Sequence, residues 1–428
     1  MTPLKIGLAG MGTVGQGVWT HLRGQADILL QRCGRPLEIR QVAVRNPEKV
    51  AALNLPPEIV TRDWRDLVKN PDLDVIVELI GGTGDAFELI RGALEAGKHV
   101  VTANKALLAE RGAELFQLAA EKKRQLLYEA SVAGGIPLLQ SLREGLIANR
   151  ITAIYGIING TCNYILSRMS AEGLDYASVL AEAKKLGYAE ADESLDVDGY
   201  DTAHKAAVLA ALAYGFWPSL KEIPTKGISN LERKDIQFAH SLGYEVKLLA
   251  ILKAGRSKRV EVQVQPTLVP LNHVLASIKG VFNAVLVRGD VVGETLFYGR
   301  GAGADPTASA VLSDLASLAQ GAEQGGLLWS QAGNVRLATP DDVVARYYLR
   351  LMVEDQPGVL AQVAAVLGRR KIGISSVIQP EGSGGPVPLI LMIHDANTHD
   401  FQEARVELEQ LPIVKGPAVS LRVEDFTS

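Results

Sequence analysis

Short apolar segments alternate with helical patterns over the first 130 residues of the chain. The apolar segments, each typical of a buried strand, lie at residues 4–9, 38–44, 74–80, 99–103 and 125–130. Helical patterns follow the first, third and fourth of them, ending near Leu30 and covering 85–96 and 106–123. Such an alternation predicts a parallel β-sheet covered by helices on both faces.

The pattern changes after the glycine pair at 134–135. Helical patterns lie at 138–147, 162–187 and 200–215, and β-rich stretches lie at 150–160 and 244–299. These segments predict an α+β region inserted after the parallel sheet. A further helix is expected at 304–320, where apolar residues again recur at helical spacing.

The last 80 or so residues show a third pattern. Strands are expected at 347–353, 374–380, 387–394 and 418–423, and helices at 357–369 and 398–410. The order βαββαβ is that of the ferredoxin-like split motif. We therefore expect a separate C-terminal unit.

Composition and charge narrow the class of protein. The 428 residues carry 44 basic and 48 acidic side chains, a net charge of −4, which gives no electrostatic footprint for nucleic acid or an anionic membrane. Two cysteines, Cys33 and Cys162, are too few for a disulfide framework. The N-terminus lacks a signal-peptide pattern, and the longest apolar run, 206–217, is too short to span a bilayer. We expect a cytoplasmic protein.

Glycine is abundant, with 42 residues, and one group of glycines forms a motif. Gly10, Gly12 and Gly15, with Thr13 and Val14 between them, form G-x-G-x-x-G after the first strand and before a helix. In a Rossmann-like domain these glycines give a tight turn, backbone access to a pyrophosphate and close helix packing. The alternative is a tight packing turn with no ligand.

The end of the second strand bears on the choice of cofactor. An acidic residue there would hold the ribose of NAD, but the sequence has Arg45. An arginine suits the 2′-phosphate of NADP. The residue favours NADP, or use of both NADP and NAD, unless Arg45 is simply a surface side chain.

Lysines are the candidate acid/base groups. Lys205 lies in a helix that is apolar on nearly all sides, and Asp201 precedes it by one turn, so that the two side chains share a face. Lys105 follows the strand 99–103, at the sheet edge where ligands bind in such folds. The alternatives are a structural ion pair for Lys205 and a surface position for Lys105. His204 is expected to be a surface or core histidine.

An acidic loop precedes that helix and contains Glu190, Asp192, Glu193, Asp196 and Asp198. It is either a solvated loop, a calcium loop without EF-hand spacing, or a site that receives the ammonium group of a substrate.

Several motifs together resemble the homoserine dehydrogenase family. They are GLAGMGTVGQGV (7–18), TANKALLA (102–109), ASVAGGIP (130–137), GIINGTCNYIL (156–166), GYAEADESLDVDGYDTAHK (187–205) and GRGAGADPTASAVLSDL (299–315). Glu193 departs from the pattern, because the family usually has proline there. The resemblance covers about residues 4–320 and implies oxidation of L-homoserine to L-aspartate 4-semialdehyde, or the reverse, with NAD or NADP.

The resemblance also implies roles for individual residues. Lys205 would be the general acid/base, Lys105 would lie beside it at the substrate and nicotinamide, and Asp201 would orient Lys205. Substrate contacts are implied at Glu190, Gly187, Asp196 and Thr161, and cofactor contacts at Asn104, Lys105, Gly301 and Gly303 in addition to the glycine loop and Arg45. A structural monovalent cation, usually sodium, is implied at Glu129, Val132, Gly134 and Ile136.

The C-terminal segment 349–379 resembles an ACT domain, an amino-acid-sensing module. Its D-x-P-G turn from Asp355 to Gly358, followed by Val359 and Leu360, would offer backbone N–H groups to a carboxylate. Family members with this tail are typically inhibited by L-threonine; the alternative is a module that only oligomerises. A homodimer through the central β-rich segments, or a tetramer through paired tails, is expected.

The expected organisation has three domains. Residues 1–135, with the returning helix 304–320, would form the Rossmann domain that binds NAD(P). Residues 136–303 would form the α+β domain for catalysis and dimerisation. A linker at 321–346 would lead to the ACT domain at 347–428.

Three other functions compete with this interpretation. A phosphoglycerate-dehydrogenase-like enzyme would need a catalytic histidine in a second Rossmann-like domain. An aspartate-semialdehyde dehydrogenase would need a nucleophilic cysteine, for which Cys162 is the candidate. A non-catalytic amino-acid sensor would have no use for Lys105, Glu190, Asp201 and Lys205 together.

Overall fold

The computed structural model describes residues 2–46, 48, 53–189, 192–321, 334–381 and 384–426. The chain divides into two compact units. The first contains Met1–Gly160, Asp201–Ile223 and Val281–Val335, and the second contains Thr161–Tyr200, Pro224–Gly280 and Arg336–Ser428. The expected central region 136–303 is thus shared between the two units, because its chain passes from one to the other several times.

A six-stranded parallel sheet forms the centre of the first unit. Its strands are β1 (Leu4–Ala9), β2 (Leu37–Ala43), β3 (Val60–Thr61), β4 (Val75–Glu78), β5 (His99–Thr102) and β6 (Leu126–Leu127). They lie in the order β3-β2-β1-β4-β5-β6, which is that of a Rossmann sheet. The order reverses between β1 and β4, and ligands of such sheets bind at this point.

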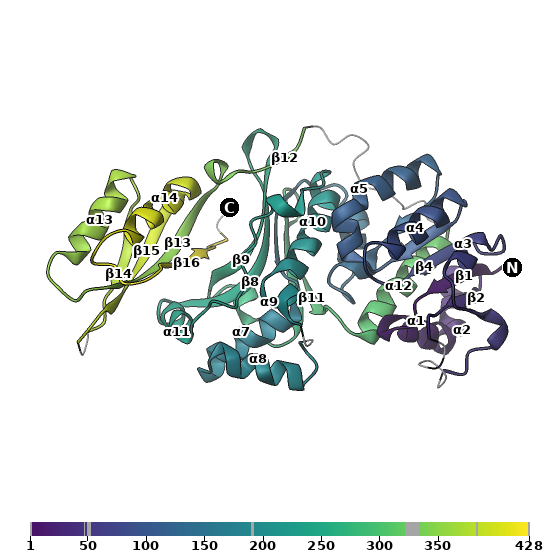
Figure 1. Ribbon diagram of the computed structural model, residues 1–428. Helices are drawn as coiled ribbons and strands as arrows, with labels where there is room; N and C mark the ends of the chain where they lie inside the picture. The colour runs from purple at the N-terminus through teal and green to yellow at the C-terminus, as the bar shows by residue number, and fades with distance from the viewer. Residues whose placement is uncertain are drawn as a thin grey trace. The chain divides into compact units, whose positions relative to one another are not determined.

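Helices cover the sheet because its strands are apolar on both faces. They are α1 (Thr13–Gly24), α2 (Ala26–Cys33), α3 (Arg65–Lys69), α4 (Asp85–Glu95), α5 (Lys105–Glu121) and α12 (Ala304–Ala319). The late helix α12 packs on α1 so closely that a Cβ on Gly17 would lie 2.9 Å from the carbonyl oxygen of Ala304. Figure 1 shows α12, coloured green, among the purple elements of the N-terminus.

The remaining elements of the first unit are a long helix and a small antiparallel sheet. Helix α10 (Tyr200–Tyr214) is buried along nearly its whole length. Strands β7 (Ile151–Ile157), β10 (Phe282–Gly289) and β11 (Gly293–Arg300) pair in the order β11-β10-β7. The helix expected at 138–147 is one turn, α6 (Leu138–Gln140), followed by a π-helical turn, η4 (Ser141–Gly145).

The second unit contains helices on one part of a large sheet. Its first elements are α7 (Gly160–Glu172), α8 (Tyr176–Lys185), α9 (Ser194–Val197), α11 (Arg233–Ser241), β8 (Tyr244–Ala254) and β9 (Arg259–Pro270). The helical stretch expected at 162–187 is therefore two helices, α7 and α8. Gly173 separates them and has a φ of +62°, which an α-helix does not accommodate.

The C-terminal segment has the expected order βαββαβ. Its elements are β13 (Val344–Val353), α13 (Val359–Arg369), β14 (Ile374–Ile378), β15 (Val387–Asn397), α14 (Thr398–Glu409) and β16 (Val419–Val423). Strands lie in the order β16-β13-β15-β14, and the two helices lie on one face of them (Figure 1). An apolar core that includes Leu349, Val363 and Leu391 lies between strands and helices.

The C-terminal strands continue a sheet of the second unit. Strand β16 pairs in parallel with β9, with Arg422 opposite Thr267 and Val423 opposite Leu268. Of the segment 321–346, which we expected to be a linker, residues 322–333 lie outside the described part of the chain; the rest contains β12 (Arg336–Leu337), the 3₁₀ turn η8 (Pro340–Asp342) and the first residues of β13. Strand β12 pairs with β9 as well, so residues 336–337 are part of the sheet.

None of the helices formed by the described residues is long and apolar enough to cross a membrane.

Candidate active site

The glycine loop joins β1 to α1 and is shaped by close contacts. A Cβ on Gly10, which has a φ of +101°, would lie 2.5 Å from the carbonyl oxygen of Leu79, and one on Gly15 would lie 2.1 Å from that of Gly10. At Gly12, by contrast, no heavy atom lies within 4 Å of the Cβ position. Gly12 also precedes α1 without a side-chain cap, so the helix start has room and N–H groups for a phosphate.

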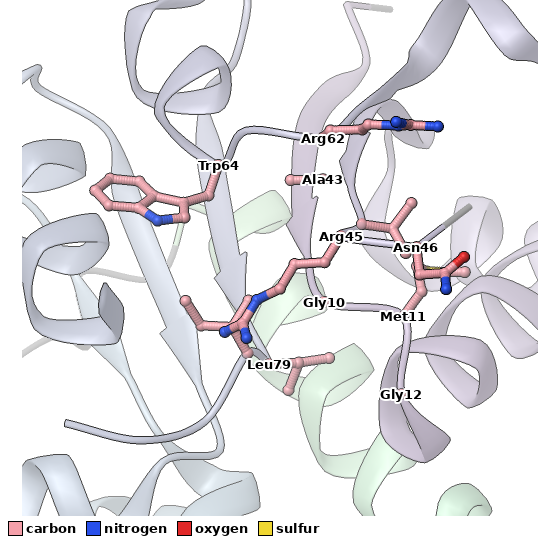
Figure 2. A pocket seen from close by; sticks show the side chains of 11 residues that line it. Gly10, Met11, Gly12, Ala43, Arg45, Asn46, Arg62, Trp64 and Leu79 are labelled. Carbon is pink, nitrogen blue, oxygen red and sulfur yellow. The ribbon is translucent and has the colours of Figure 1, made fainter. Parts of the chain in front are cut away.

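A cleft of about 370 Å³ opens beside this loop. Beyond the loop it is lined mainly by Arg45 and Asn46, which follow β2, and by Arg62 and Trp64, which follow β3. Figure 2 shows the Arg45 side chain and the Trp64 ring on the same side of the cleft, whereas the Arg62 guanidinium points away from that of Arg45. Arg62 and Trp64 were not among the residues expected to bind the cofactor, because β3 has two residues and is not part of a longer apolar run.

A second cleft, of about 350 Å³, lies on the other side of the glycine loop and shares Gly12 with the first. It is lined by residues of the loop and of the edges of β4 and β5, among them Thr13, Val14, Gly15, Glu78, Gly81, Asn104 and Lys105. The two clefts together follow the carboxyl edge of the sheet, where a dinucleotide binds in this fold.

Two lysines share one carboxylate in the first unit. The Nζ atom of Lys205 lies 2.7 Å from Asp201 Oδ2, and that of Lys105 lies 2.9 Å from Asp201 Oδ1. Lys205 also donates to the carbonyl oxygen of Ile158 at 2.7 Å, and the Asn159 amide donates to Asp201 at 2.9 Å. The structure therefore brings together the three residues expected to be catalytic, in a cluster with one net positive charge.

Burial differs within this cluster. The side chain of Lys105 is 40% exposed, whereas those of Lys205 and Asp201 are 10% and 9% exposed. Burial by itself would raise the pKa of the Asp201 carboxyl, but the two ammonium groups more than offset it and hold that pKa well below its usual range. Asp201 is thus a fixed negative charge that keeps both lysines in place.

Helix α10 positions Asp201 and Lys205 because its other faces are apolar. Eleven of its residues from Ala203 to Tyr214 are buried, so the helix cannot turn without exposing them. His204, on the same helix, is half-buried, and burial lowers the pKa of its imidazole.

The residues expected to bind substrate belong to the second unit. The hydroxyl of Thr161 donates to the carbonyl oxygen of Tyr188 at 2.6 Å and to Asp196 Oδ2 at 3.2 Å. Gly187, with a φ of +73°, turns the chain at the end of α8. The structure thus brings Thr161 to Asp196, while Glu190 lies outside the described residues.

Glu193 stands where the family usually has proline, and it has a partner. Its carboxylate lies 2.6 Å from the Lys184 Nζ atom, and this contact lowers the pKa of the carboxyl. An ion pair therefore ties this part of the loop to α8.

Gly301 and Gly303 lie just before α12 and line neither of the two clefts. A Cβ on Gly301 would lie 1.8 Å from the Asn283 side chain, and one on Gly134 would lie 2.4 Å from the carbonyl oxygen of Gly301. Gly303 has a φ of +124° and precedes α12. Because Gly134 and Gly301 have no side chains, the loop after β6 and the segment before α12 can lie against each other.

Glu129, one of the expected cation ligands, is buried in a polar cluster. Its carboxylate accepts hydrogen bonds from the backbone amides of Leu139 and Gln140, at 2.9 and 2.7 Å, and lies 3.8 Å from the Arg143 guanidinium. Its own backbone amide donates to Asp314 at 2.9 Å. Burial and the neighbouring Glu129 raise the pKa of Asp314 to about 8.

The loop that carries the other expected cation ligands is tightly turned. Ala133 and Gly134 both have positive φ, +57° and +48°, and the carbonyl oxygen of Ile136 accepts from the Leu138 amide at 2.7 Å. Val132 and Ile136 are buried. Only backbone oxygens are available at these positions, together with the carboxylate of Glu129.

In the C-terminal segment, Gly358 begins α13 with a φ of +88° and without a side-chain cap. Asp355 accepts a hydrogen bond from Gln379 at 3.4 Å. Val359 is buried and contributes to the core, whereas Leu360 is 42% exposed. The turn therefore presents backbone amides and the Leu360 side chain to solvent.

Cys162 does not have the surroundings of a nucleophile. It is buried, and its thiol donates to the carbonyl oxygen of Asp196. A reactive thiol is accessible and has its pKa lowered by nearby positive charge. The described residues also form one parallel six-stranded sheet, without the second Rossmann-like domain of the phosphoglycerate-dehydrogenase alternative.

Comparisons with known proteins agree on one family. A model described as the NAD binding domain of homoserine dehydrogenase matches residues 10–129, and a model described as homoserine dehydrogenase matches residues 137–316. A homoserine dehydrogenase of Pseudomonas aeruginosa is 44% identical over 442 residues, covering 100% of both chains.

Solved structures give the same result. A crystal structure of a homoserine dehydrogenase from Thiobacillus denitrificans has a TM-score of 0.95 and 42% identity, over 99% of each chain. A hyperthermophilic archaeal homoserine dehydrogenase in complex with NADPH has a TM-score of 0.64 and 28% identity. That match covers 97% of the archaeal chain but 74% of the present one.

Proposed function

The chain belongs to the homoserine dehydrogenase family, and from this premise we propose that Lys205 is the general acid/base for interconversion of L-homoserine and L-aspartate 4-semialdehyde. Family membership makes it an oxidoreductase of amino-acid biosynthesis that uses a nicotinamide cofactor. The observation that carries the proposed role is the Lys105–Asp201–Lys205 cluster, whose Lys105 lines a cleft beside the glycine loop.

The cluster suits proton transfer to an alcohol oxygen. The cofactor, when bound, supplies or accepts the hydride. In the reductive direction the electron pair of the carbonyl bond moves to oxygen, and positive charge at Lys205 and Lys105 stabilises the growing negative charge. An ammonium N–H of Lys205 then supplies the proton; in the oxidative direction the neutral amine takes it back. Asp201 keeps both ammonium groups in place, which makes it a positioning residue.

Substrate recognition is proposed for the loop residues. The carboxylates of Glu190 and Asp196 would receive the ammonium group of homoserine, with Gly187 and Thr161 shaping the loop. Support comes from the hydrogen bond between Thr161 and Asp196, which fixes one of these carboxylates. Gly301 and Gly303 are proposed as backbone contacts to the cofactor.

NADP is proposed as the preferred cofactor. Arg45 is exposed at the first cleft, and no ion pair involves it among the described residues. A guanidinium in this position matches a 2′-phosphate. Arg62 adds positive charge to the same cleft. The archaeal relative in complex with NADPH supports this choice.

A monovalent cation is proposed at Glu129 and the carbonyl oxygens of Val132, Gly134 and Ile136. The residues fit a cation, because two carboxyl groups, Glu129 and Asp314, are buried together. Hard cations are bound by such oxygen ligands. The cation would serve structure, holding the loop that follows β6.

The C-terminal segment is proposed to be an ACT domain that binds L-threonine and inhibits the enzyme. Its βαββαβ order and the uncapped turn at Gly358 support this role. Because the family model for homoserine dehydrogenase ends at residue 316, before the tail, regulation rather than catalysis is the proposed task of the tail.

A homodimer is proposed through the strands β10 and β11. Strand β11 is an edge strand, and apolar side chains on it and on the preceding turn are exposed: Val291 by 76%, Val292 by 50% and Tyr298 by 54%. An exposed edge with apolar residues favours pairing with a second copy. Paired tails would extend the dimer to a tetramer.

Steady-state kinetics test the proposed function. We expect L-homoserine to produce absorbance at about 340 nm with NADP⁺ and more weakly with NAD⁺, and L-threonine to lower the rate. No reduction of either cofactor would overturn the proposed activity. A rate that threonine leaves unchanged would overturn only the regulatory role.

A further inference from the structure

A buried carboxylate lies beneath the cofactor cleft and has no part in the reaction described above. Glu78 is the last residue of β4, and it is completely buried. Its Oε2 atom accepts from the Thr102 hydroxyl at 2.5 Å, and its Oε1 atom accepts from the amides of Ile80 and Gly81 at 3.0 and 3.1 Å. Burying a carboxyl group this deeply costs free energy, and these hydrogen bonds offset the cost.

The amides bound by Glu78 belong to the turn that follows β4. Gly81 and Gly82 both have a φ of +72°, a left-handed conformation that glycine adopts readily. Gly81 lines the second cleft, and the carbonyl oxygen of Gly82 accepts a hydrogen bond from the side-chain amide of Asn104 at 2.7 Å. One oxygen of Glu78 therefore anchors one wall of the cleft.

The other oxygen of Glu78 reaches the neighbouring start of α5 through Thr102. The hydroxyl of Thr102 accepts from the backbone amide of Asn104 at 3.0 Å. The Asn104 side chain in turn caps α5 by accepting from the Leu107 amide at 3.1 Å. Lys105 is the first residue of α5, so its backbone position depends on this chain of hydrogen bonds.

We propose that Glu78 is a positioning residue that holds the Gly81–Gly82 turn and the neighbouring Asn104–Lys105 helix start in place at the edge of the second cleft. It acts through Thr102 and Asn104 and does not contact substrate. The proposal rests on the proposed function, because it assigns Lys105 to the active site. A carboxylate suits this position since both of its oxygens accept hydrogen bonds; a glutamine can accept at only one.

The experiment compares Glu78→Gln and Thr102→Val with the conservative Thr102→Ser and with Leu67→Ala. Leu67 is a buried residue of the same unit that lines neither cleft, so Leu67→Ala lowers stability without touching the hydrogen bonds. All variants are made in the full chain. The thermal midpoint, the Kd for NADPH, and kcat and KM for homoserine are measured for each.

For Glu78→Gln and Thr102→Val we expect kcat to fall by about tenfold or more and the Kd for NADPH to rise by about fivefold, while KM for homoserine changes little. Thr102→Ser should retain the wild-type values. Leu67→Ala should lower the thermal midpoint and leave kcat and the Kd nearly unchanged.

Two results would overturn the proposal. One is a folded Glu78→Gln variant whose kcat and Kd for NADPH both stay within about twofold of the wild type. The other is an equal loss in Leu67→Ala, which would show that general destabilisation explains the effect. If the wild type binds NADPH but does not oxidise homoserine, the proposed function fails, and the Kd alone then decides the role of Glu78.

Discussion

At the residue scale, the arrangement of two ammonium groups on one carboxylate explains how a lysine can serve a buried site. An isolated buried ammonium would lose its proton, but Asp201 lies within 2.9 Å of both Lys205 and Lys105. In the proposed mechanism, the partly exposed Lys105 and the buried Lys205 both stabilise the charge that develops on the substrate oxygen.

Replacing Lys205 tests its role directly. Lys205→Met keeps the length of the side chain but removes the proton donor, so kcat should fall by roughly 10²–10⁴-fold. The Kd for NADPH, measured by fluorescence, should stay near the wild-type value because Lys205 lines neither cleft. Lys69→Met, at an exposed position of α3, is the matched control. A kcat near that of the control would refute the assignment.

The proposed preference for NADP depends on a single residue, Arg45. Arg45→Ala should lower kcat/KM for NADP⁺ by about 10–100-fold, since a charge-assisted hydrogen bond to phosphate contributes about 1.5–3 kcal/mol. The value for NAD⁺ should change little. Arg40→Ala, on β2, removes a neighbouring exposed guanidinium that pairs with Glu38 and serves as the control. An equal loss with both cofactors would contradict a 2′-phosphate site.

At the scale of elements, α12 is joined to the loop after β6 by buried polar groups. Asp314 on α12 accepts from the Glu129 amide, and both carboxyls are buried near Arg143. Burial comes first among the causes that raise the pKa of Asp314 to about 8, and Glu129 adds to it. This junction should therefore be sensitive to pH.

The sign of that dependence follows from proton binding. The folded protein keeps Asp314 protonated up to about pH 8, whereas the unfolded chain releases this proton near pH 4, its ordinary range. The contribution of Asp314 to stability is therefore largest at low pH and is lost as the pH rises between these values. Asp314→Asn removes it, so the variant should gain stability relative to the wild type by up to about 1.4 kcal/mol per pH unit.

Urea unfolding at about pH 5 and about pH 7.5, in buffer without sodium or potassium salts so that the proposed cation site is empty, measures this difference. Asp27→Asn, an exposed position on α2, is the control and should show no such trend. A difference between Asp314→Asn and the wild type that stays constant with pH would show that Asp314 ionises normally in the folded protein.

At the scale of the whole molecule, the C-terminal segment is bound to the second unit by buried ion pairs as well as by strand pairing. The Arg350 guanidinium of β13 lies 2.5 and 3.0 Å from the two oxygens of Asp235 on α11, and Tyr348 donates to the same carboxylate at 3.2 Å. Arg422 of β16 pairs with Glu261 of β9. The tail, for which we propose a regulatory role, is thus bonded directly to the elements it would influence.

Removing one partner of such a buried ion pair should destabilise the protein. Arg350→Met leaves the completely buried Asp235 without its guanidinium and should lower the free energy of unfolding by roughly 3–5 kcal/mol. Adding Asp235→Leu removes the unpaired charge and should restore part of the loss. Chemical denaturation of both variants checks this. If the double variant loses as much free energy of unfolding as the two single variants together, Arg350 and Asp235 are not coupled.

Much of the fold was predictable because it depends on local patterns. Five of the six strands of the parallel sheet, the glycine loop and the βαββαβ order of the tail follow from periodicity and turn residues that a few neighbours determine. Strand β3 was missed because it is not part of a longer apolar run, and the π-helical turn after α6 was missed because its five residues produce no periodic signal of their own. The division of the central region between two units was missed as well.

The sequence by itself determined the pairing of Asp201 with Lys205, because residues four apart on a helix share a face. Only the tertiary structure decided which distant groups join them. Lys105 reaches Asp201 from the end of β5, Asp314 meets Glu129 across 185 residues, and Arg350 meets Asp235 across 115. Such contacts depend on how whole elements pack, and no local pattern along the chain records the distance between them. The same holds for Glu78, whose strand was predicted but whose buried hydrogen bonds appear only when β4, β5 and the turn between them are folded together.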